Sequence, residues 1–296
     1  MDSMLGWLKH KITFLHHLFK LEDQLANGLS FFVGIILAFG GIPPLSMNLL
    51  YGFLAVSGSL LGINLLNQIT DIKIDKINKP HRPLPSGKMS ENTATILSAI
   101  LFLGACTFAV LASLQVFYLT IFYIFLGIVY SAEPIRLKER FLFNNLATAI
   151  GYNFLNFLIG WVIFQPILQA PFPLLLLLFT YDFIAINSKD YFDLAGDKKF
   201  GVKTLVSLLG VDAAMKIDRH AHFLIQLTFI LLALLGFLPS YIIAFSVITI
   251  VFVFVMFFDL SQNKNFMRFY HMSFGMHIIF RILILVLFFT HIFKLL

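Results

Sequence analysis

Two clusters of carboxylates in the sequence could perform chemistry. The first, residues 67–75, reads NQITDIKID, and the second, residues 190–197, reads DYFDLAGD. Each contains two aspartates four positions apart, followed by a lysine; the pairs are Asp71 with Asp75 and Asp193 with Asp197. In a helix this spacing places both carboxylates of a pair on one face, where they repel each other unless a cation lies between them.

The chemistry that such pairs favour is binding of Mg²⁺. This ion prefers oxygen ligands, and it usually binds through one or two carboxylates together with the phosphates of a substrate. Carboxylates cannot hold a diphosphate directly, but they can hold it through Mg²⁺, which inverts the local charge. One pair would fit an ordinary solvated helix end. Two pairs with the same spacing predict instead a site for a phosphorylated, diphosphate-type substrate.

The composition indicates where this site must lie. Of the 296 residues, 59% are hydrophobic and 12% are charged, whereas soluble domains carry about 25% charged residues. The mean hydropathy is +0.89. Such a chain can be neither a soluble globular domain nor a disordered one, and its continuous apolar stretches differ from the alternating pattern of a β-barrel. A single cysteine, Cys106, excludes an intrachain disulfide and a cysteine-built metal site.

We therefore predict an all-α, polytopic membrane bundle of about nine transmembrane helices. A hydrocarbon core of about 30 Å requires about 20 apolar residues in helical form. The stretches that qualify are Leu25–Ile42, Met47–Leu66, Ile96–Leu114, Val116–Tyr130, Asn144–Phe164, Pro173–Asn187, Phe223–Leu238, Tyr241–Phe258 and Ser273–Phe293. The aspartate pairs follow the second and sixth of these stretches, which places both on the same side of the membrane.

The basic residues predict the orientation. Of the 21 Lys and Arg residues, only Arg281 and Lys294 fall outside the N-terminal segment and alternate connections. By the positive-inside rule this side is cytoplasmic, so the N-terminus and both aspartate motifs are predicted to be cytoplasmic. The basic residues that set the orientation in the membrane also account for the net charge of +6, so this charge does not indicate binding to nucleic acid. Residues 1–20 lack a signal-peptide cleavage site, and their apolar stripe predicts an interfacial amphipathic helix.

The motifs resemble those of a known family. Asn67-x-x-x-Asp71-x-x-x-Asp75, followed by KPHRPLPSG at 79–87, looks like the first signature of the UbiA superfamily of intramembrane prenyltransferases. Residues 189–204, KDYFDLAGDKKFGVKT, look like the second. The segment 130–138, YSAEPIRLK, resembles the loop between them. Two positions depart from the family pattern. Gln68 stands where many members have Asp, and Glu133 precedes Pro134 where many members have paired prolines.

The resemblance implies a single domain, residues 1–296, whose helices surround a central cavity open toward the lipid. Two Mg²⁺ ions would hold a prenyl diphosphate between the aspartate motifs, and the prenyl group would pass to a lipophilic acceptor. The acceptor stays open among a quinone precursor, a chlorophyllide-type compound and a glycerol-phosphate lipid. The metal ligands implied are Asp71, Asp75, Asp193 and Asp197, which are also the candidate catalytic residues, together with Asn67.

A further set of residues is expected to bind the substrate. Basic side chains can stabilise the oxygens of a leaving diphosphate, and aromatic faces attract an allylic cation. The candidates are Asn67, Arg82, Tyr130, Arg136, Lys138, Asp190, Tyr191 and Lys203. No partner other than the substrates and the lipid bilayer is predicted, and the oligomeric state is left open.

Among the polar residues inside the apolar stretches, four are given roles. Asn153 and Asn156 are expected either to line the cavity or to join helices by hydrogen bonds, and Asp182 is expected at the cavity. Arg281 is predicted to anchor the bundle by pairing with a carboxylate or a carbonyl. A secondary transporter remains the alternative function, but it would place acids deep within broken helices, whereas the paired acids cluster near one surface.

Overall fold

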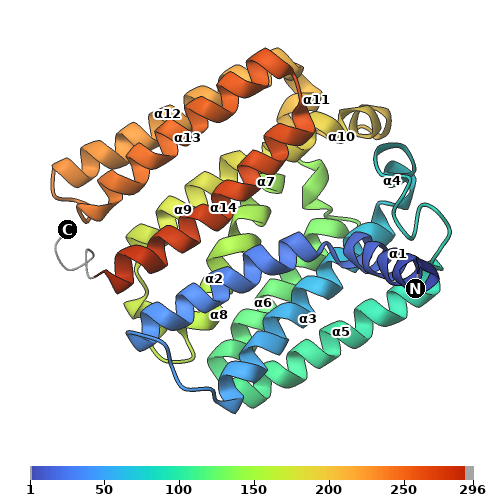
Figure 1. Ribbon diagram of the computed structural model, residues 1–296, viewed down its shortest axis with the longest axis horizontal. Helices are drawn as coiled ribbons and strands as arrows, with labels where there is room; N and C mark the ends of the chain where they lie inside the picture. The colour runs from blue at the N-terminus through green and yellow to red at the C-terminus, as the bar shows by residue number, and fades with distance from the viewer. Residues whose placement is uncertain (1, 291–296) are drawn as a thin grey trace.

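The computed structural model describes residues 2–290, with side chains from residue 11 onward, and is built from helices; no strand occurs among these residues. Eight helical segments are long and apolar enough to cross a membrane: Leu21–Phe39, Met47–Thr70, Glu91–Ala112, Leu114–Ser131, Phe172–Phe200, Val211–Leu234, Tyr241–Asn263 and Phe266–Phe289. They correspond to eight of the nine predicted stretches, although the last three residues of the ninth stretch lie outside the described residues. The prediction of an all-α membrane bundle of about nine spans is confirmed (Figure 1).

The helices follow one another with short connections. They are α1 (Asp2–Phe19), α2 (Leu21–Phe39), α3 (Met47–Thr70), α4 (Ile72–Asn78), α5 (Glu91–Ala112), α6 (Leu114–Ser131), α7 (Phe143–Ala149), α8 (Leu155–Trp161), α9 (Phe172–Ala185), α10 (Asn187–Phe200), α11 (Leu205–Leu209), α12 (Val211–Leu234), α13 (Tyr241–Asn263) and α14 (Phe266–Phe289). Serines begin several of them, because a serine hydroxyl accepts a hydrogen bond from the otherwise unpaired N–H groups of the first turn. Ser46, Ser90 and Ser113 cap α3, α5 and α6 in this way.

The fifth predicted stretch, Asn144–Phe164, forms a helix with an irregular centre. Its first part is α7, its last part is α8, and a π-helical turn, η2 (Ile150–Phe154), joins them. A π turn inserts an extra residue and changes which side chains face the interior. Because α7 and α8 are only seven residues each, this stretch is not among the eight segments long enough to span a membrane.

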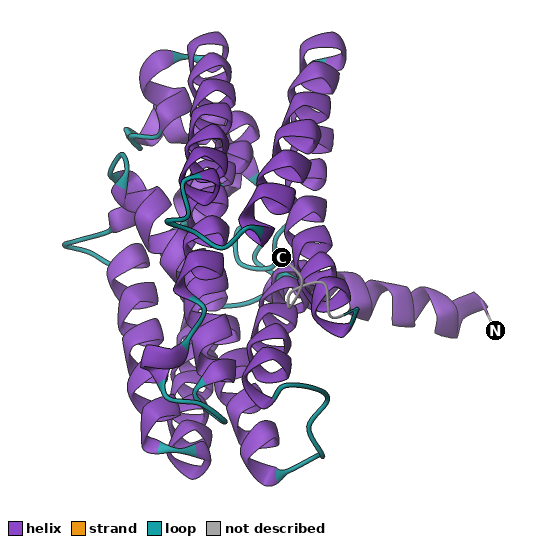
Figure 2. Cartoon of the chain, turned by 90° about the vertical axis from the view of Figure 1, so that its left-hand side faces the viewer, coloured by secondary structure: helices purple, strands orange, loops and turns teal. Residues whose placement is uncertain are grey.

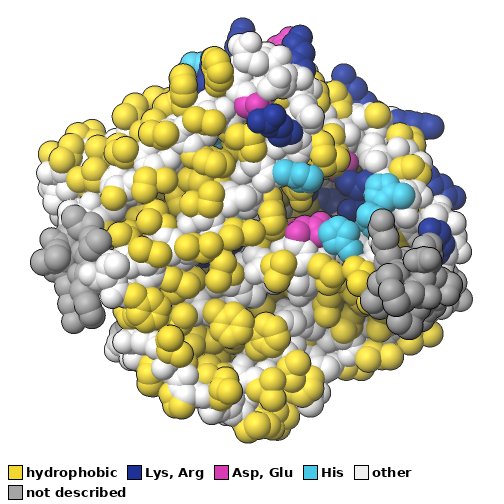
Figure 3. All heavy atoms as spheres, viewed as in Figure 1, with side chains coloured by type: hydrophobic (Ala, Val, Ile, Leu, Met, Phe, Trp, Pro, Cys, Tyr) yellow, Lys and Arg dark blue, Asp and Glu magenta, His cyan; other side chains and the backbone are white. Residues whose placement is uncertain are grey.

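The helices surround an interior that holds buried apolar side chains. On one side α2 packs against α8 at two glycines, Gly34 and Gly160, where an added Cβ would overlap the backbone carbonyls of Phe157 and Phe31. Close packing of backbones at small residues is typical of membrane helices. Large apolar side chains such as Leu103 and Phe254 are exposed, and the face shown in Figure 3 is covered mainly by hydrophobic atoms. This outer surface suits contact with lipid.

The polar parts of the protein gather at one end of the bundle. Figure 1 shows α4, α10 and α11 at this end, with α1 beside them. Basic, acidic and histidine side chains crowd the same end around a hollow in Figure 3. Helix α1 projects sideways from the bundle (Figure 2), and its position in the membrane interface stays a prediction.

Candidate active site

Both aspartate motifs line one polar cavity of about 100 Å³ at the charged end of the bundle. Their side chains come from α3, α4 and α10, which are far apart in the sequence. The predicted residues that line this cavity are Asn67, Asp71, Asp75, Arg82, Tyr130, Lys138, Asp190, Asp193 and Asp197. The structure therefore brings together nine of the side chains that sequence spacing singled out.

The first motif lies at a break between two helices. Asp71 ends α3 and precedes α4, with φ −103° and ψ 7°, outside helical geometry. Asp75 lies within α4 and is 3% exposed. The spacing predicts that both carboxylates lie on one face of a helix. This prediction is wrong for the first pair, because the helix breaks at Asp71. In the second motif, Asp193 and Asp197 do share the helix α10.

A close contact between α4 and α10 joins the two motifs. The side-chain amide of Asn78 donates to the carbonyl of Asp193 at 2.8 Å and accepts from the N–H of Gly196 at 2.8 Å. A Cβ added at Gly196 would lie 2.5 Å from the amide nitrogen of Asn78. A larger residue at 196 would displace the Asn78 amide and disturb its two hydrogen bonds, so glycine permits the contact that places the motifs opposite each other.

Basic side chains neutralise the carboxylates. Arg82 donates to Asp75 at 2.7 Å, and the Lys79 ammonium lies 2.5 Å from Asp193. Since like charges at close range repel, these ion pairs allow the acids to lie together without a metal ion. The same basic groups can reach the oxygens of a bound diphosphate.

The loop after α6 supplies two more cations. Arg136 lies 3.1 Å and Lys138 lies 2.6 Å from Asp71. Lys138 also donates to Asn67 at 3.1 Å and to Thr70 at 2.7 Å. Burial lowers the pKa of the Lys138 ammonium, while the neighbouring carboxylate of Asp71 opposes this shift. The loop is thereby attached to the end of α3, as expected from a motif that contributes to the same site.

The acids fit the way in which proteins bind Mg²⁺. Asp190 is 3% exposed, and its Oδ2 atom is buried without a hydrogen-bond partner. In the described part of the chain, no three His, Cys, Asp or Glu side chains are close enough to form a complete metal cage. Mg²⁺ seldom uses such a cage, since it retains waters and binds one or two carboxylates plus substrate phosphates. An unpartnered oxygen among spaced carboxylates matches that requirement.

Three of the predicted substrate-binding residues do not line the cavity. Arg136 acts through its contact with Asp71. The side chain of Lys203 is exposed, and only its backbone N–H is engaged here, with the carbonyl of Glu139. Tyr191 is buried away from the cavity, where its hydroxyl donates to Asp218 at 2.7 Å. The structure gives Tyr191 and Lys203 no contact with the site.

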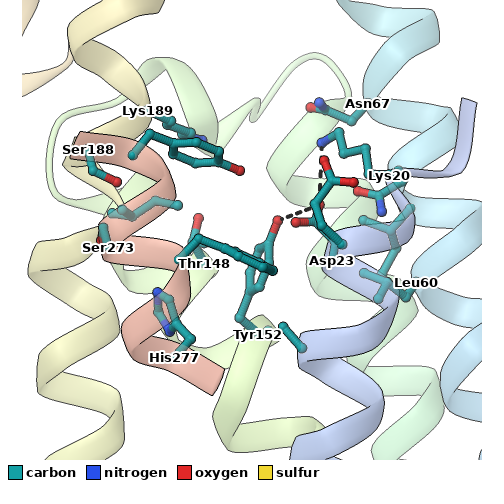
Figure 4. Close-up of a pocket in the computed structure, with 18 of the residues that line it drawn as sticks. Lys20, Asp23, Leu60, Asn67, Thr148, Tyr152, Ser188, Lys189, Ser273 and His277 are labelled. Carbon is teal, nitrogen blue, oxygen red and sulfur yellow. Dashed lines mark hydrogen bonds and ion pairs between the residues drawn. The ribbon is translucent and has the colours of Figure 1, made fainter. Parts of the chain in front are cut away.

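A larger cavity of about 360 Å³ adjoins the polar one. The two share lining residues, among them Asn67, Lys79, Tyr130, Lys189 and Asp193. Apolar side chains such as Leu60 and Leu126 line the larger cavity together with several aromatic rings. Figure 4 shows part of its wall, with residues of α2 on one side and of α14 on the other. The predicted central cavity is present, with a charged compartment at one end.

The polar residues within the spans form one buried network. Asp182 lines the large cavity, as predicted, and contacts Asn153 and the His277 ring. Asn153 also accepts from Ser30 at 2.8 Å and so joins helices. Arg281 is 2% exposed and donates to the carbonyl of His277 and to Ser30. This pairing agrees with the expected anchor, although Arg281 also borders the cavity.

Asn156 and the residues that depart from the family pattern also have structural partners. Asn156 donates to Asn27 at 2.6 Å, which joins the broken helix to α2. Gln68 is fully buried and donates to the carbonyl of Leu18 at 2.6 Å, which ties α1 to α3. The Glu133–Pro134 peptide bond is cis, and the Glu133 side chain is exposed. Neither departure places its side chain in a cavity.

Sequence reasoning missed several residues that the fold brings to the site. Asn78 and Lys79 border the first motif, and the lysine was visible within the signature. Lys189 donates to the Tyr130 hydroxyl at 3.0 Å. Asp23 and Tyr152 meet across the large cavity wall. No spacing signal links these last two residues, because 129 positions separate them in the chain.

The fold and the site define an integral, multi-pass membrane protein with paired aspartate motifs at the end of a central cavity. Residues 28–280 match the UbiA prenyltransferase family, so the chain belongs to this family and is a transferase. The resemblance on which the sequence analysis relied is confirmed. The alternative of a secondary transporter is set aside, because members of the family are prenyltransferases.

Relatives with known names support the assignment. The chain is 28% identical to digeranylgeranylglyceryl phosphate synthase of Sulfurisphaera tokodaii, over 79% of this chain and 80% of the relative. It is 31% identical to the synthase of the same name from Saccharolobus solfataricus, over 71% and 69% of the two chains. A probable homogentisate phytyltransferase of rice is 34% identical over 54% of this chain and 45% of its own length.

Solved structures confirm the fold. A UbiA homologue from Archaeoglobus fulgidus bound to DMAPP and Mg²⁺ superimposes with a TM-score of 0.69 and 18% identity, covering 92% of this chain and 98% of the homologue. A digeranylgeranylglyceryl phosphate synthase superimposes with a TM-score of 0.63 and 22% identity, covering 94% and 98%. The arrangement of helices is therefore that of the UbiA proteins.

Proposed function

We propose that this protein catalyses the Mg²⁺-dependent transfer of a polyprenyl group from a prenyl diphosphate to a lipophilic acceptor, with release of diphosphate. The observation that carries the proposal is the junction of two cavities, one lined by both aspartate motifs and one whose surface is mainly apolar although polar side chains also line it. A prenyl diphosphate has the same division into a charged head and an apolar tail. The solved relative with DMAPP and Mg²⁺ supports the same pairing of ligands.

The polar compartment would hold the diphosphate. Asp71, Asp75, Asp193 and Asp197, with Asn67, are the proposed ligands of two Mg²⁺ ions, and these ions would supply Lewis acidity toward the leaving group. The basic side chains that pair with the carboxylates in the structure would bind the diphosphate oxygens. They are Lys79, Arg82 and Lys138, which line the polar cavity, while Arg136 would hold Asp71 from outside it. Charge-assisted hydrogen bonds of this kind stabilise the negative charge that develops as the C–O bond breaks.

The larger compartment would hold the prenyl chain and the acceptor. Cleavage of an allylic C–O bond leaves positive charge on the prenyl group, and aromatic faces attract a cation by about 0.5–2 kcal/mol each. Rings of Tyr123, Tyr130, Phe192 and Phe274 line this cavity. Its apolar walls also exclude water, which would otherwise compete with the acceptor.

We propose a glycerol-phosphate lipid as the acceptor. Relatives named digeranylgeranylglyceryl phosphate synthase make a product with two geranylgeranyl groups, which implies an acceptor that carries one. Basic groups line part of the large cavity, including Lys20, His17 and His81. The His17 and His81 rings lie 4.6 Å apart, and burial lowers the pKa of each imidazole. A phosphate head group would pair with the Lys20 ammonium and favour the protonated form of these imidazoles.

Mass spectrometry of products tests the proposed function. Purified protein receives Mg²⁺, geranylgeranyl diphosphate and one of three acceptors: geranylgeranylglycerol phosphate, a hydroxybenzoate or chlorophyllide. We expect an adduct of the first acceptor that disappears when EDTA is added. An adduct of either other acceptor in its place would overturn the choice of acceptor. No adduct with any acceptor, and no diphosphate release, would overturn the proposed reaction.

We also propose that the aspartate motifs face the cytoplasm, as the distribution of basic residues predicts. Labelling of single cysteines can test this in a Cys106→Ala background. Lys73 and Lys199 are exposed beside the two motifs, and Leu168 is 86% exposed in the connection predicted for the other face. In intact cells, an impermeant maleimide should label Leu168→Cys but spare Lys73→Cys and Lys199→Cys. The reverse pattern would invert the orientation, and labelling of one motif alone would contradict the shared face.

A further inference from the structure

A buried carboxylate outside both aspartate motifs lies on the wall of the large cavity. Asp23 is in the first turn of α2 and is 4% exposed. Burial of an ionised carboxylate is costly unless other groups pair with it. The family signatures in the sequence do not include this residue, and the diphosphate site does not require it. Its presence in the cavity therefore calls for a separate role.

Three features orient this carboxylate. The Tyr152 hydroxyl donates to Asp23 Oδ2 at 3.0 Å, and the Lys20 ammonium lies 3.8 Å from the same oxygen. Figure 4 shows these three side chains converging at the cavity. The N-terminal turn of a helix also favours negative charge. Burial lowers the pKa of Lys20 to about 8, so its ammonium group is still mainly charged at neutral pH.

The broken helix aims the tyrosine at the carboxylate. Tyr152 lies within the π turn η2, and π turns are frequent at functional sites because they reorient side chains. Asn156, in the following helix α8, donates to Asn27 of α2, and Asn27 donates to the Asp23 carbonyl at 2.7 Å. These bonds hold η2 and the first turns of α2 together. The geometry of the pair therefore depends on several contacts beyond the hydrogen bond itself.

The other acids of the large cavity have different partners. Asp193 pairs with Lys79 in the diphosphate site, and Asp182 contacts the His277 ring deep in the bundle. Glu22 lies 3.1 Å from His16, with a partly exposed side chain. Among the acids that line this cavity, Asp23 combines burial, a hydroxyl donor and a position outside the metal-binding motifs.

We propose that Asp23 is the general base that accepts the proton lost by the acceptor hydroxyl, and that Tyr152 is a positioning residue that orients it. This inference rests on the proposed function. The hydroxyl oxygen forms a bond to C1 of the prenyl group, while the C1–O bond breaks and its electron pair leaves with the diphosphate. The hydroxyl proton passes to the Asp23 carboxylate and then to water at the cavity mouth. Atoms and charge balance without a further reactant.

Asp23→Asn tests the base, because the amide keeps the size of the side chain but does not accept the proton. General base catalysis contributes about 10²–10⁴-fold to a rate. We expect kcat for transfer from geranylgeranyl diphosphate to geranylgeranylglycerol phosphate to fall by that factor, with KM for the diphosphate within about threefold of wild type. The melting temperature should change little.

Ionisation of the prenyl diphosphate should survive in the same variant, since Asp23 acts on the acceptor. Migration of ¹⁸O from the bridging to the non-bridging positions of geranylgeranyl diphosphate measures this step, with a deoxy acceptor analogue in the site. Exchange that continues in Asp23→Asn while transfer is lost supports the base. Loss of both would place Asp23 in the diphosphate site and overturn the proposal. Wild-type protein with neither exchange nor transfer would instead overturn the proposed function.

Two further variants separate the roles. Asp212→Asn is the matched control, because it removes an exposed carboxylate from the first turn of another helix, α12, outside both cavities, and should retain wild-type transfer. Tyr152→Phe should slow transfer by about tenfold without loss of isotope exchange. Transfer by Asp23→Asn at more than a third of the wild-type rate would overturn the proposal. If this variant does not fold, Asp23→Ala is assayed with sodium formate, whose carboxylate can replace the deleted group. Failure of formate to raise the rate would likewise overturn it.

Discussion

The two aspartate motifs differ in how their charges are balanced. In the first, Asp75 binds Arg82, while Asp71 binds Arg136 and Lys138. In the second, Asp193 pairs with Lys79, and Asp190 keeps a buried oxygen without a hydrogen-bond partner. The first motif also lies at a helix break, whereas the second lies within α10.

Because of this difference, the carboxylates of the two motifs are not equally ready to bind a cation. Three basic side chains hold the first motif in place without metal, and they must release its carboxylates when Mg²⁺ binds. In the second motif, Asp193 must leave its ion pair with Lys79, whereas Asp190 offers an oxygen that has no hydrogen-bond partner. We therefore expect the second motif to respond more strongly to Mg²⁺, although catalysis requires both motifs.

The largest effects should follow from removal of one aspartate in either motif. Asp71→Ala and Asp193→Ala should each lower transfer by about 10³-fold or more, because both motifs grip one diphosphate. Effects of residues that act as a unit are strongly non-additive, so the double variant should be scarcely slower than either single variant. Product formation over time provides the three rates. If the fold-loss in the double variant equals the product of the two single fold-losses, the motifs act independently and the prediction is contradicted.

Removal of the lysine that balances the second motif should have a smaller effect. Lys79→Met leaves Asp193 without its ion-pair partner, next to the buried Asp190. A lost hydrogen bond between charged groups costs about 1.5–3 kcal/mol, so the metal-free protein should melt several degrees lower. Added Mg²⁺ should recover most of this loss. Differential scanning fluorimetry measures both shifts.

Arg82→Met provides the matched control for Lys79→Met, because it removes one cation from the first motif. Its metal-free melting temperature should also fall. Recovery with Mg²⁺ should be weaker, since Arg136 and Lys138 still compete for the neighbouring Asp71. Equal recovery in the two variants would remove the proposed difference between the motifs.

The smallest effect on catalysis should come from the buried arginine of α14. Arg281→Leu leaves Ser30 and the His277 carbonyl without their donor, and an unsatisfied buried group costs about 1–3 kcal/mol. We expect a lower melting temperature with KM for prenyl diphosphate largely unchanged. A tenfold rise in this KM at unaltered melting temperature would move Arg281 from the anchor role into the substrate site.

Much of the fold could be predicted because the signals are local. Apolar length predicts spans, and eight predicted stretches overlap the spanning helices, although α12 begins at Val211 rather than Phe223 and α14 at Phe266 rather than Ser273. A π turn interrupts the fifth stretch. That turn has no local signature, since Gly151 is compatible with many conformations. The helix break at Asp71 was missed for a related reason. Periodicity describes a regular helix, whereas the cluster of Arg136 and Lys138 with Asp71 is a tertiary contact.

The candidate site could be predicted where motifs carry its residues, and not elsewhere. Spacing identified the aspartates, but a motif does not reveal where each side chain points. Tyr191 faces Asp218 rather than the cavity, although the adjacent Asp190 lines it. The pairing of Asp23 with Tyr152 depends on packing between α2 and the broken helix. Contacts between distant segments depend on tertiary packing, which spacing does not encode.

The central claim is that both motifs bind one diphosphate through Mg²⁺, and a melting curve tests it most directly. A ligand that binds the folded state raises its stability by mass action. Wild-type protein should show a joint shift with Mg²⁺ plus a non-hydrolysable geranylgeranyl diphosphate analogue that exceeds the sum of the two separate shifts. Asp71→Ala and Asp193→Ala should each lose this joint shift while remaining folded. A wild-type protein without a joint shift, or variants that retain it, would contradict the account.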